Sequence, residues 1–127
     1  MRYLALMLVS LTYQIAEAAP DSYSISTLKN GQQIGLRKVS SVEMRQSSSA
    51  LANAFQEKRP SYDEMLDVAA SMTAKDRCFN LFSAKLAVGA VEAGKIDVSA
   101  TAESFLKDTI ATIDQINKQT NVSCEIK

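Results

Sequence analysis

One segment of the chain, residues 78–93, is apolar around most of its helical circumference. Large side chains such as Phe82, Leu86 and Val91 alternate there with alanines and with Gly89. A helix of this kind is usually covered by other elements on most sides. The segment therefore predicts the central helix of a small helical domain. Glycine lowers helix stability by about 1 kcal/mol relative to alanine, so we expect another element to pack closely at Gly89, although a ligand groove would also explain it.

The stretch from Ser40 to Pro60 reads as a helix that precedes the central one. Ser40 and Glu43 fit a capping box, in which a hydroxyl and a carboxylate satisfy each other's backbone N–H groups. Lys58 and Arg59 lie where cations suit a helix C-terminus, and Pro60 cannot continue the helix. We therefore expect this helix to end at Pro60.

Further start signals divide the rest of the chain. Ser61–Glu64 forms a second capping box. Thr73 provides another start, so the helix after residue 61 either ends near Met72 or continues with a bend into the central helix. Ser99 can cap a last helix, and Asn121 can end it in the left-handed conformation.

Two segments alternate with the period of a strand. Residues 22–39 read as a β-hairpin, because Asn30-Gly31 suits a two-residue type I′ turn. A disordered N-terminal arm is the alternative for this region. Val122–Ile126 is a short alternating tail that can form a third strand beside the hairpin. The expected organisation is therefore a hairpin or extended arm over 19–39 and a helical domain with a short C-terminal tail over 40–127.

The first 18 residues differ in composition from the rest. Arg2 precedes an apolar run, Tyr3–Leu11, and a less apolar stretch then leads to Ala16-Glu17-Ala18, with small side chains at alternate positions. This order is typical of a secretory signal peptide, which we expect to cover 1–18. A membrane anchor needs about 20 apolar residues, and Gln14 and Glu17 come too early for that. We therefore expect a periplasmic or secreted protein without a stable membrane anchor.

The two cysteines, Cys78 and Cys124, lie after the proposed signal peptide. In an exported chain, two cysteines most simply form one disulfide. A redox or nucleophilic role would need a CxxC pair or a histidine to activate a thiolate, and the sequence has neither. The fold class that results is mainly α: a small three- to four-helix bundle with a short N-terminal β-hairpin and one disulfide.

Composition excludes several functions. The chain has 14 Lys and Arg against 14 Asp and Glu, and it contains no His. The even charge gives no electrostatic reason to expect a nucleic-acid partner. The missing His removes most zinc and copper sites and the common nucleophilic triads. We therefore predict no cofactor and no metal site.

Few residues suggest catalysis. The carboxylates of Asp63, Glu64 and Asp67 crowd the start of a helix, where the helix dipole explains them. Ser83 and Lys85 are two residues apart on a helix, so their side chains point apart. Met44, Met65 and Met72 lie at helical spacing on apolar faces, so we interpret them as core residues. We interpret the short basic clusters as scattered surface charge: Arg37/Lys38/Arg45, Lys58/Arg59 and Lys75/Arg77. Asn121 heads an N-glycosylation pattern, which matters only in a eukaryote. We predict no enzyme activity.

These observations favour a small exported interaction protein that works by surface complementarity. It would be an inhibitor or immunity-type protein of an envelope enzyme, or an accessory subunit of an envelope assembly. Its partner is expected to be another protein in the envelope or the extracellular space, and a homodimer stays open. The alternatives are a periplasmic stress chaperone and a small-ligand-binding helical protein.

Overall fold

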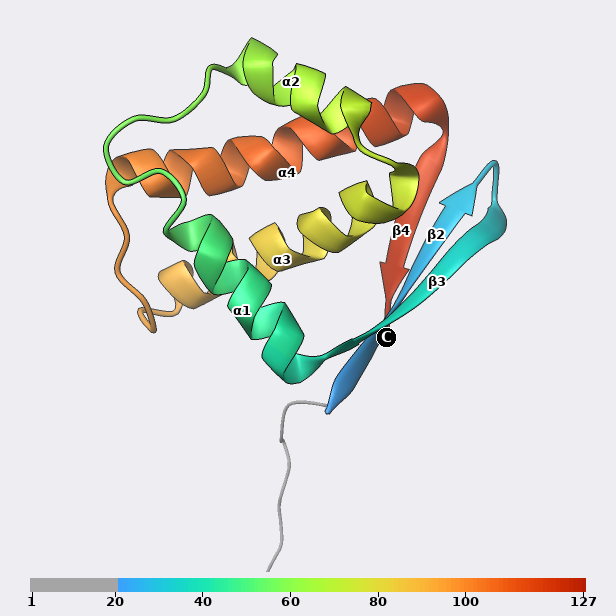
Figure 1. The fold of residues 1–127 in the computed structure, drawn as a ribbon, viewed down its shortest axis with the longest axis horizontal. Coiled ribbons are helices and arrows are strands. Elements are labelled where there is room, and N and C mark those ends of the chain that lie inside the picture. Colours follow the sequence, from blue (N-terminus) through green and yellow to red (C-terminus); the bar gives the residue numbers. More distant parts are fainter. Residues whose placement is uncertain (1–20) are drawn as a thin grey trace, which may run out of the picture.

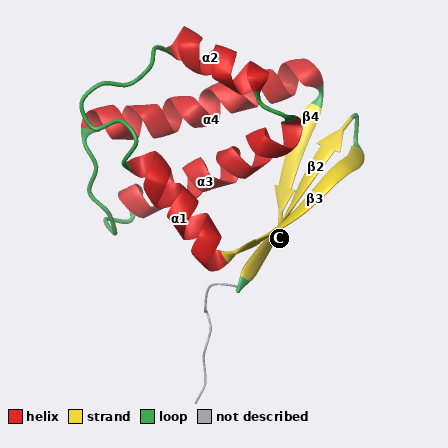
Figure 2. Ribbon diagram, viewed as in Figure 1, coloured by secondary structure: helices red, strands yellow, loops and turns green. Residues whose placement is uncertain are grey.

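The computed structural model describes residues 21–127, which form four helices and a three-stranded sheet (Figures 1 and 2). The proposed signal peptide over 1–18 lies outside the described residues. In chain order the elements are β2 (Ser22–Lys29), β3 (Gln32–Ser40), α1 (Ser41–Ala52), α2 (Tyr62–Ser71), α3 (Ala74–Glu92), α4 (Ala100–Thr120) and β4 (Val122–Ile126).

The helices lie side by side in the neighbour order α1–α3–α4–α2, and the sheet covers one end of α3 and α4 (Figure 1). The helical content and the disulfide of the predicted fold class are thus confirmed. The details of the hairpin and the bundle differ from the predicted fold class. The hairpin is part of a three-stranded sheet, because β4, the tail expected as a third strand, pairs with β2 in the antiparallel order β3–β2–β4. The helix over 74–92 has α1 and α4 as its helical neighbours and is not surrounded.

The turn between β2 and β3 has the predicted form. Asn30 and Gly31 both have positive φ, 52° and 80°, as a type I′ turn requires. The register then shifts by one residue, since Thr27 lies opposite Gly35 while Leu28 lies opposite Gln33. This shift is a β-bulge near the tip of the hairpin.

The disulfide lies where the sheet meets α3. Cys78, near the start of α3, is bonded to Cys124 in β4, and the two residues are 46 apart in sequence. Cys78 is fully buried in a cluster with apolar residues of β2, β3, α1 and β4: Ile25, Val39, Met44 and Val122. Sheet and helices therefore share one core at this end of the molecule.

Helix α1 ends at Ala52, earlier than predicted. The side-chain amides of Asn53 and Gln56 donate to the Ser49 and Ala52 carbonyls, at 2.8 and 3.4 Å. These amides bond the last carbonyls of α1 from outside the helix, as polar side chains commonly do at helix ends. Pro60 consequently lies in the loop before α2 and does not end α1.

The other helix starts agree with the predicted caps. The hydroxyls of Ser61, Thr73 and Ser99 each accept a backbone N–H of the first turn of α2, α3 and α4. Helices α2 and α3 are separate, because Met72 between them is extended. Helix α4 ends at Asn121, whose φ of 60° is left-handed. At Ser40 only the hydroxyl half of the predicted capping box is present, because the Glu43 carboxylate instead pairs with Arg37.

The capping box of α2 gives a pH-dependent prediction. The Ser61 backbone N–H donates to the Glu64 carboxylate at 2.8 Å, and this bond is the main cause that lowers the pKa of Glu64 below its usual 4.5. A carboxyl with a lowered pKa stabilises the folded state above its unfolded pKa, and it loses that effect as pH falls through the folded value. Glu64→Gln should therefore be less stable than the native protein at pH 7, and the difference should close below about pH 4.5.

Urea unfolding of the two proteins between pH 3 and 7 measures this difference. Glutamine keeps the capping-box geometry, so the comparison isolates the charge of Glu64. A stability difference that stays constant over the whole range would contradict the role given to this carboxylate.

Arg77 is the one member of the predicted basic clusters that the structure buries among residues 21–127; its exposed fraction is 5%. Its Nε donates to Asn117 Oδ1 at 2.7 Å, and its Nη1 donates to the Met72 carbonyl at 2.8 Å. Burial lowers the pKa of the guanidinium, which still stays charged at neutral pH. The prediction of scattered surface charge was thus wrong for Arg77, which ties the end of α2 to α4.

Candidate binding groove

A groove of about 530 Å³ runs between α1 and α3. Residues of α1, of α3 and the turn after it, and Tyr23 of β2 contribute its lining. The apolar α3 positions Leu86, Gly89, Ala90 and Ala93 are called its floor, and the other lining residues its walls. The residues that line it are Tyr23, Arg45, Ser48, Ser49, Lys85, Leu86, Ala87, Gly89, Ala90, Ala93, Lys95 and Ile96. Ligand sites usually have volumes of about 300–1,000 Å³, so the groove is large enough for a small organic molecule.

Gly89 lies in the floor of this groove. A Cβ built on Gly89 would meet no atom within 4 Å. The expected close packing of another element at this position was therefore wrong. Leu86, Ala90 and Ala93 lie at helical spacing from Gly89 on the same face of α3 and line the same groove. The wide apolar surface of α3 is thus explained in part by a face that no other described element covers.

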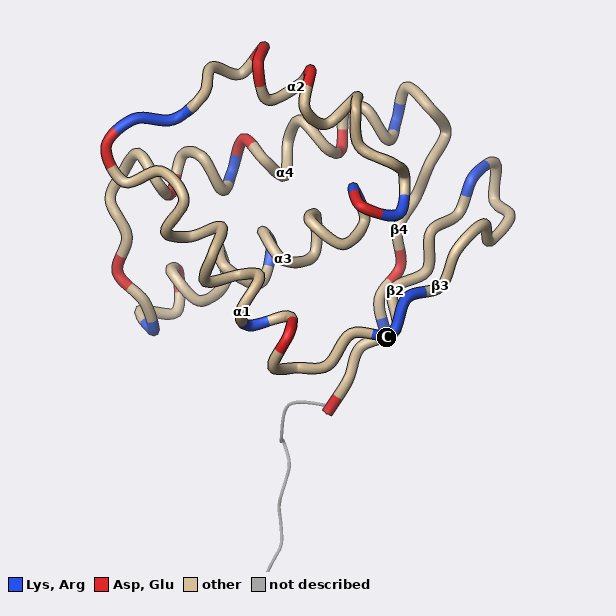
Figure 3. The backbone as a smooth tube through the Cα atoms, viewed as in Figure 1, with Lys and Arg blue, Asp and Glu red and all other residues tan. Residues whose placement is uncertain are grey.

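The charges on the groove are all of one sign. Arg45, Lys85 and Lys95 line it and are exposed, while no acidic residue lines it. Within residues 21–127, the ion pairs are Arg37–Glu43, Arg59–Asp108 and Lys107–Glu103, and none of them involves a groove cation. Elsewhere in the described chain, charges of both signs occur along the backbone (Figure 3). The groove is therefore a local basic site on a molecule without net charge.

Ser48, one of the hydroxyl-bearing residues that line the groove, and its neighbour Ser47 both bond to Ser83. Ser48 donates to the Ser83 carbonyl at 2.8 Å, and Ser47 donates to the Ser83 hydroxyl at 2.9 Å. Ser83 is fully buried, whereas Lys85 is exposed. The structure therefore does not bring Ser83 and Lys85 together as a nucleophile and base, in agreement with their helical spacing.

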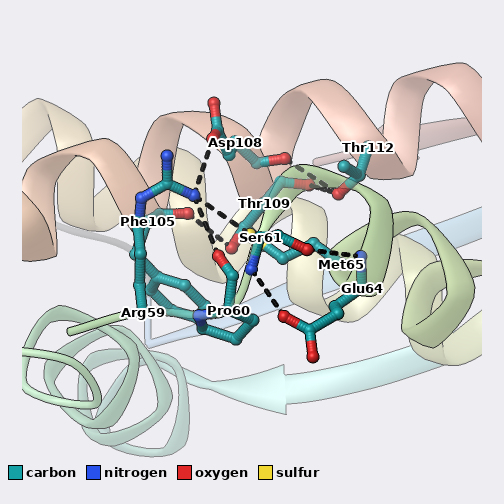
Figure 4. Close-up of polar contacts among 9 residues, drawn as sticks. All are labelled: Arg59, Pro60, Ser61, Glu64, Met65, Phe105, Asp108, Thr109 and Thr112. Atoms are coloured by element: carbon teal, nitrogen blue, oxygen red, sulfur yellow. Dashed lines mark hydrogen bonds and ion pairs between the residues drawn. The ribbon is translucent and has the colours of Figure 1, made fainter.

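A second, smaller hollow of about 210 Å³ lies between α2 and α4. Its lining is almost entirely apolar, with Met65, Phe105 and Ile113 among its residues. The hydroxyls of Thr109 and Thr112 donate to carbonyls of their own helix, at 2.7 and 2.8 Å (Figure 4). This hollow therefore offers apolar surface and few free polar groups.

Arg59 lies beside Pro60 and Met65, two residues that line the second hollow (Figure 4). Its Nη1 lies 2.9 Å from an Asp108 carboxylate oxygen and donates to the Pro60 carbonyl at 3.1 Å. Arg59 was predicted to lie at the end of a helix, but it holds the loop before α2 against α4. The acids singled out in the sequence lie elsewhere, since Asp63, Glu64 and Asp67 line neither hollow.

Met44 and Met65 lie in the core, as their helical spacing predicts, and the short basic clusters are dispersed over the molecule. Met44 and Met65 are buried in different apolar clusters. The guanidinium of Arg37 lies 4.1 Å from the centre of the Phe79 ring, while Arg45 lines the groove. Across residues 21–127 no group of three His, Cys, Asp or Glu side chains is placed to hold a metal ion.

The outer edge of the sheet carries a third surface feature. Strand β3 is an edge strand, and no described strand pairs with its outer side. Ile34 and Leu36 in β3, and Val42 just after it, are 47%, 58% and 53% exposed. Exposed large apolar side chains on an unpaired edge strand, as at Ile34 and Leu36, are typical of an interaction surface.

Comparison with known proteins does not assign this chain to a family. No family model matches it, and neither the curated proteins nor the solved structures include a significant match. In the part of the chain that the structure describes, no helix has the length and apolar character needed to span a membrane.

Proposed function

We propose that the chain is a small exported protein-interaction module in which β3 accepts an extended strand from a partner protein. The observation that carries this proposal is the open edge of β3 with its exposed apolar side chains. Addition of a strand to an exposed sheet edge is a common mode of recognition, in which main-chain hydrogen bonds provide affinity and side chains provide specificity.

The backbone of β3 supports this mode of binding. The Ser41 N–H donates to the Asp21 carbonyl at 2.9 Å, which makes these two residues a hydrogen-bonded pair. Bonded pairs alternate along an antiparallel ladder, so Arg37 and Val39 bond to β2. Leu36 and Lys38 then direct their N–H and C=O groups toward the open edge. The Leu36 side chain lies on the sheet face opposite buried Ile25, where it can contact an added strand.

Export is supported by two independent features of the chain. The pattern over residues 1–18 is typical of a signal peptide. The Cys78–Cys124 disulfide suits an oxidising compartment. An inhibitor or immunity-type protein of an envelope enzyme, or an accessory subunit of an envelope assembly, would use a stable scaffold of this kind to present an edge strand.

Site-specific photo-crosslinking in the cells of origin tests this proposal. A photoreactive residue in place of Leu36 should form one discrete adduct with a partner protein. The matched control is Val68 on α2, which is apolar and 54% exposed but lies away from the sheet. No adduct is expected from position 68.

A second pair of variants tests the hydrogen bonds. Lys38→Pro removes the N–H that faces the open edge and leaves the bonds to β2 in place, because proline is tolerated on edge strands with the N–H side facing solvent. Lys38→Gln removes the charge and keeps the N–H. The adduct should disappear in Lys38→Pro and persist in Lys38→Gln, with both variants folded by circular dichroism. Equal adducts from positions 36 and 68, or an adduct with the mass of two copies of this chain, would overturn the proposal.

A further inference from the structure

We propose that the groove between α1 and α3 binds an amphiphilic anion: a molecule with a single anionic head group and an alkyl chain, as in a free fatty acid. This site is separate from the edge of β3 and does not depend on the function proposed for that edge. Three properties of the groove support it: its volume, its apolar floor and the sign of its charges.

The floor is suited to an alkyl chain. Leu86, Gly89, Ala90 and Ala93 place small or apolar side chains along one face of α3. From Leu86 to Ala93 the helix rises about 10 Å, which gives the floor an elongated shape. The absence of a side chain at Gly89 keeps the middle of the floor open, since a Cβ there would meet nothing within 4 Å. Burial of apolar surface would drive binding of the chain.

The walls are suited to an anionic head group. Arg45 comes from α1, Lys85 from α3 and Lys95 from the turn that follows α3, so cations approach the groove from more than one element. None of them forms an ion pair within the described residues. Hydrogen bonds between cations and carboxylates are about twice as strong as neutral ones. The charge complement of this site is therefore an anion.

An amphiphile fits the groove better than an acidic peptide does. A peptide backbone needs hydrogen-bond partners along its length, but the Ser48 hydroxyl already donates to the Ser83 carbonyl. The floor of α3 presents only aliphatic surface at Leu86, Ala90 and Ala93.

Ser48 bonds to Ser83, two residues before Lys85 on α3, and Arg45 lies one turn before Ser48 on α1. Arg45 and Lys85 therefore belong to one end of the groove, whereas Lys95 lies past Ala93 at the other end. The anionic head group is assigned to the end with Arg45 and Lys85.

Isothermal titration of the disulfide-bonded protein, residues 19–127, with laurate below its micelle concentration tests the proposal. Laurate should bind saturably at one site. Dodecanol, which has the same chain and no charge, should bind about tenfold more weakly, since it loses the charge-assisted bonds. Acetate should show no measurable binding.

Two variants locate the site. Gly89→Leu fills the floor and should abolish laurate binding. This variant should not unfold the protein, because leucine has the higher helix propensity and the position has free space. The double variant Arg45→Gln/Lys85→Gln should weaken laurate binding about tenfold or more. Lys118→Gln, an exposed cation on α4 outside the groove, is the matched control and should bind laurate as the native protein does.

Two further ligands, phosphatidylglycerol vesicles and a glutamate-rich decapeptide, test whether the anion is a free amphiphile, a membrane lipid or an acidic peptide. If the protein binds laurate but does not sediment with phosphatidylglycerol vesicles, the ligand is a free amphiphile. If the protein sediments with the vesicles and Gly89→Leu abolishes this, the ligand is a membrane lipid. Laurate binding that Gly89→Leu leaves unchanged would overturn the proposal, as would dodecanol that binds as tightly as laurate. The proposal would also be overturned if laurate does not bind and a glutamate-rich decapeptide binds in a way that Gly89→Leu abolishes.

Discussion

Replacement of Cys78 and Cys124 by alanine is expected to lower the free energy of unfolding by about 4 kcal/mol. The bridge closes a segment of 46 residues, and a cross-link of this span restricts the unfolded chain strongly in the chain-entropy model. The total stability of a domain is typically about 5–15 kcal/mol. Loss of the bridge would therefore remove a large share of it.

The position of the bridge adds to this effect. Cys78 is fully buried beside residues of the sheet, and Cys124 lies in β4. Without the bond, two contacts hold β4 to the rest of the molecule: its hydrogen bonds with β2 and the buried Val122 side chain in the core. Alanine avoids the unsatisfied hydroxyl that serine would place in this buried cluster.

Urea unfolding of the double variant and of the native protein measures the change. Reduction of the native protein with dithiothreitol should cause most of the same loss of stability, because the disulfide is broken while the side chains stay almost the same. A difference below about 1 kcal/mol would show that the bridge does not restrict the unfolded chain as the entropy model requires.

Arg77→Met is expected to have the second largest effect, a loss of about 3 kcal/mol or more. Methionine retains much of the length and apolar area of the arginine stem, but it donates no hydrogen bond. The buried Asn117 amide oxygen and the Met72 carbonyl would then lose their donor. A buried polar group without a partner costs about 1–3 kcal/mol.

Two control variants separate the geometry of Arg77 from its charge. Arg77→Lys keeps the charge, but one ammonium cannot reproduce the fork that reaches both α2 and α4, so its stability should lie between those of the native protein and Arg77→Met. Lys118→Met removes an exposed cation from α4 and should change stability by about 0.5 kcal/mol or less. Equal losses in Arg77→Met and Lys118→Met, measured by thermal unfolding, would contradict the role assigned to Arg77.

The features that the sequence predicted correctly depend on neighbouring residues. The Asn30-Gly31 turn and the caps at Ser61 and Ser99 need only a few adjacent positions, so a short pattern identifies them. The disulfide was predictable because the sequence contains only Cys78 and Cys124. In each case a short motif, or the number of cysteines, allows only one simple structure.

The features that the sequence did not reveal depend on segments far apart. Arg77 looks like any surface cation until α4 supplies Asn117 as its partner, 40 residues later. Gly89 indicates an unusual environment, but a close contact and an open groove both suit a glycine. Only the placement of α1 beside α3 decides between them. The early end of α1 is the local exception, because the Asn53 and Gln56 amides that bond its last carbonyls lie only four residues from their acceptors.

The central place of β2 has a consequence for biosynthesis. This strand lies between β3, which follows it directly, and β4, which the ribosome makes only after all four helices. Until β4 is available, on the ribosome or after export, β2 lacks one of its two neighbouring strands. A chain in that state is open to pairing with the wrong strand.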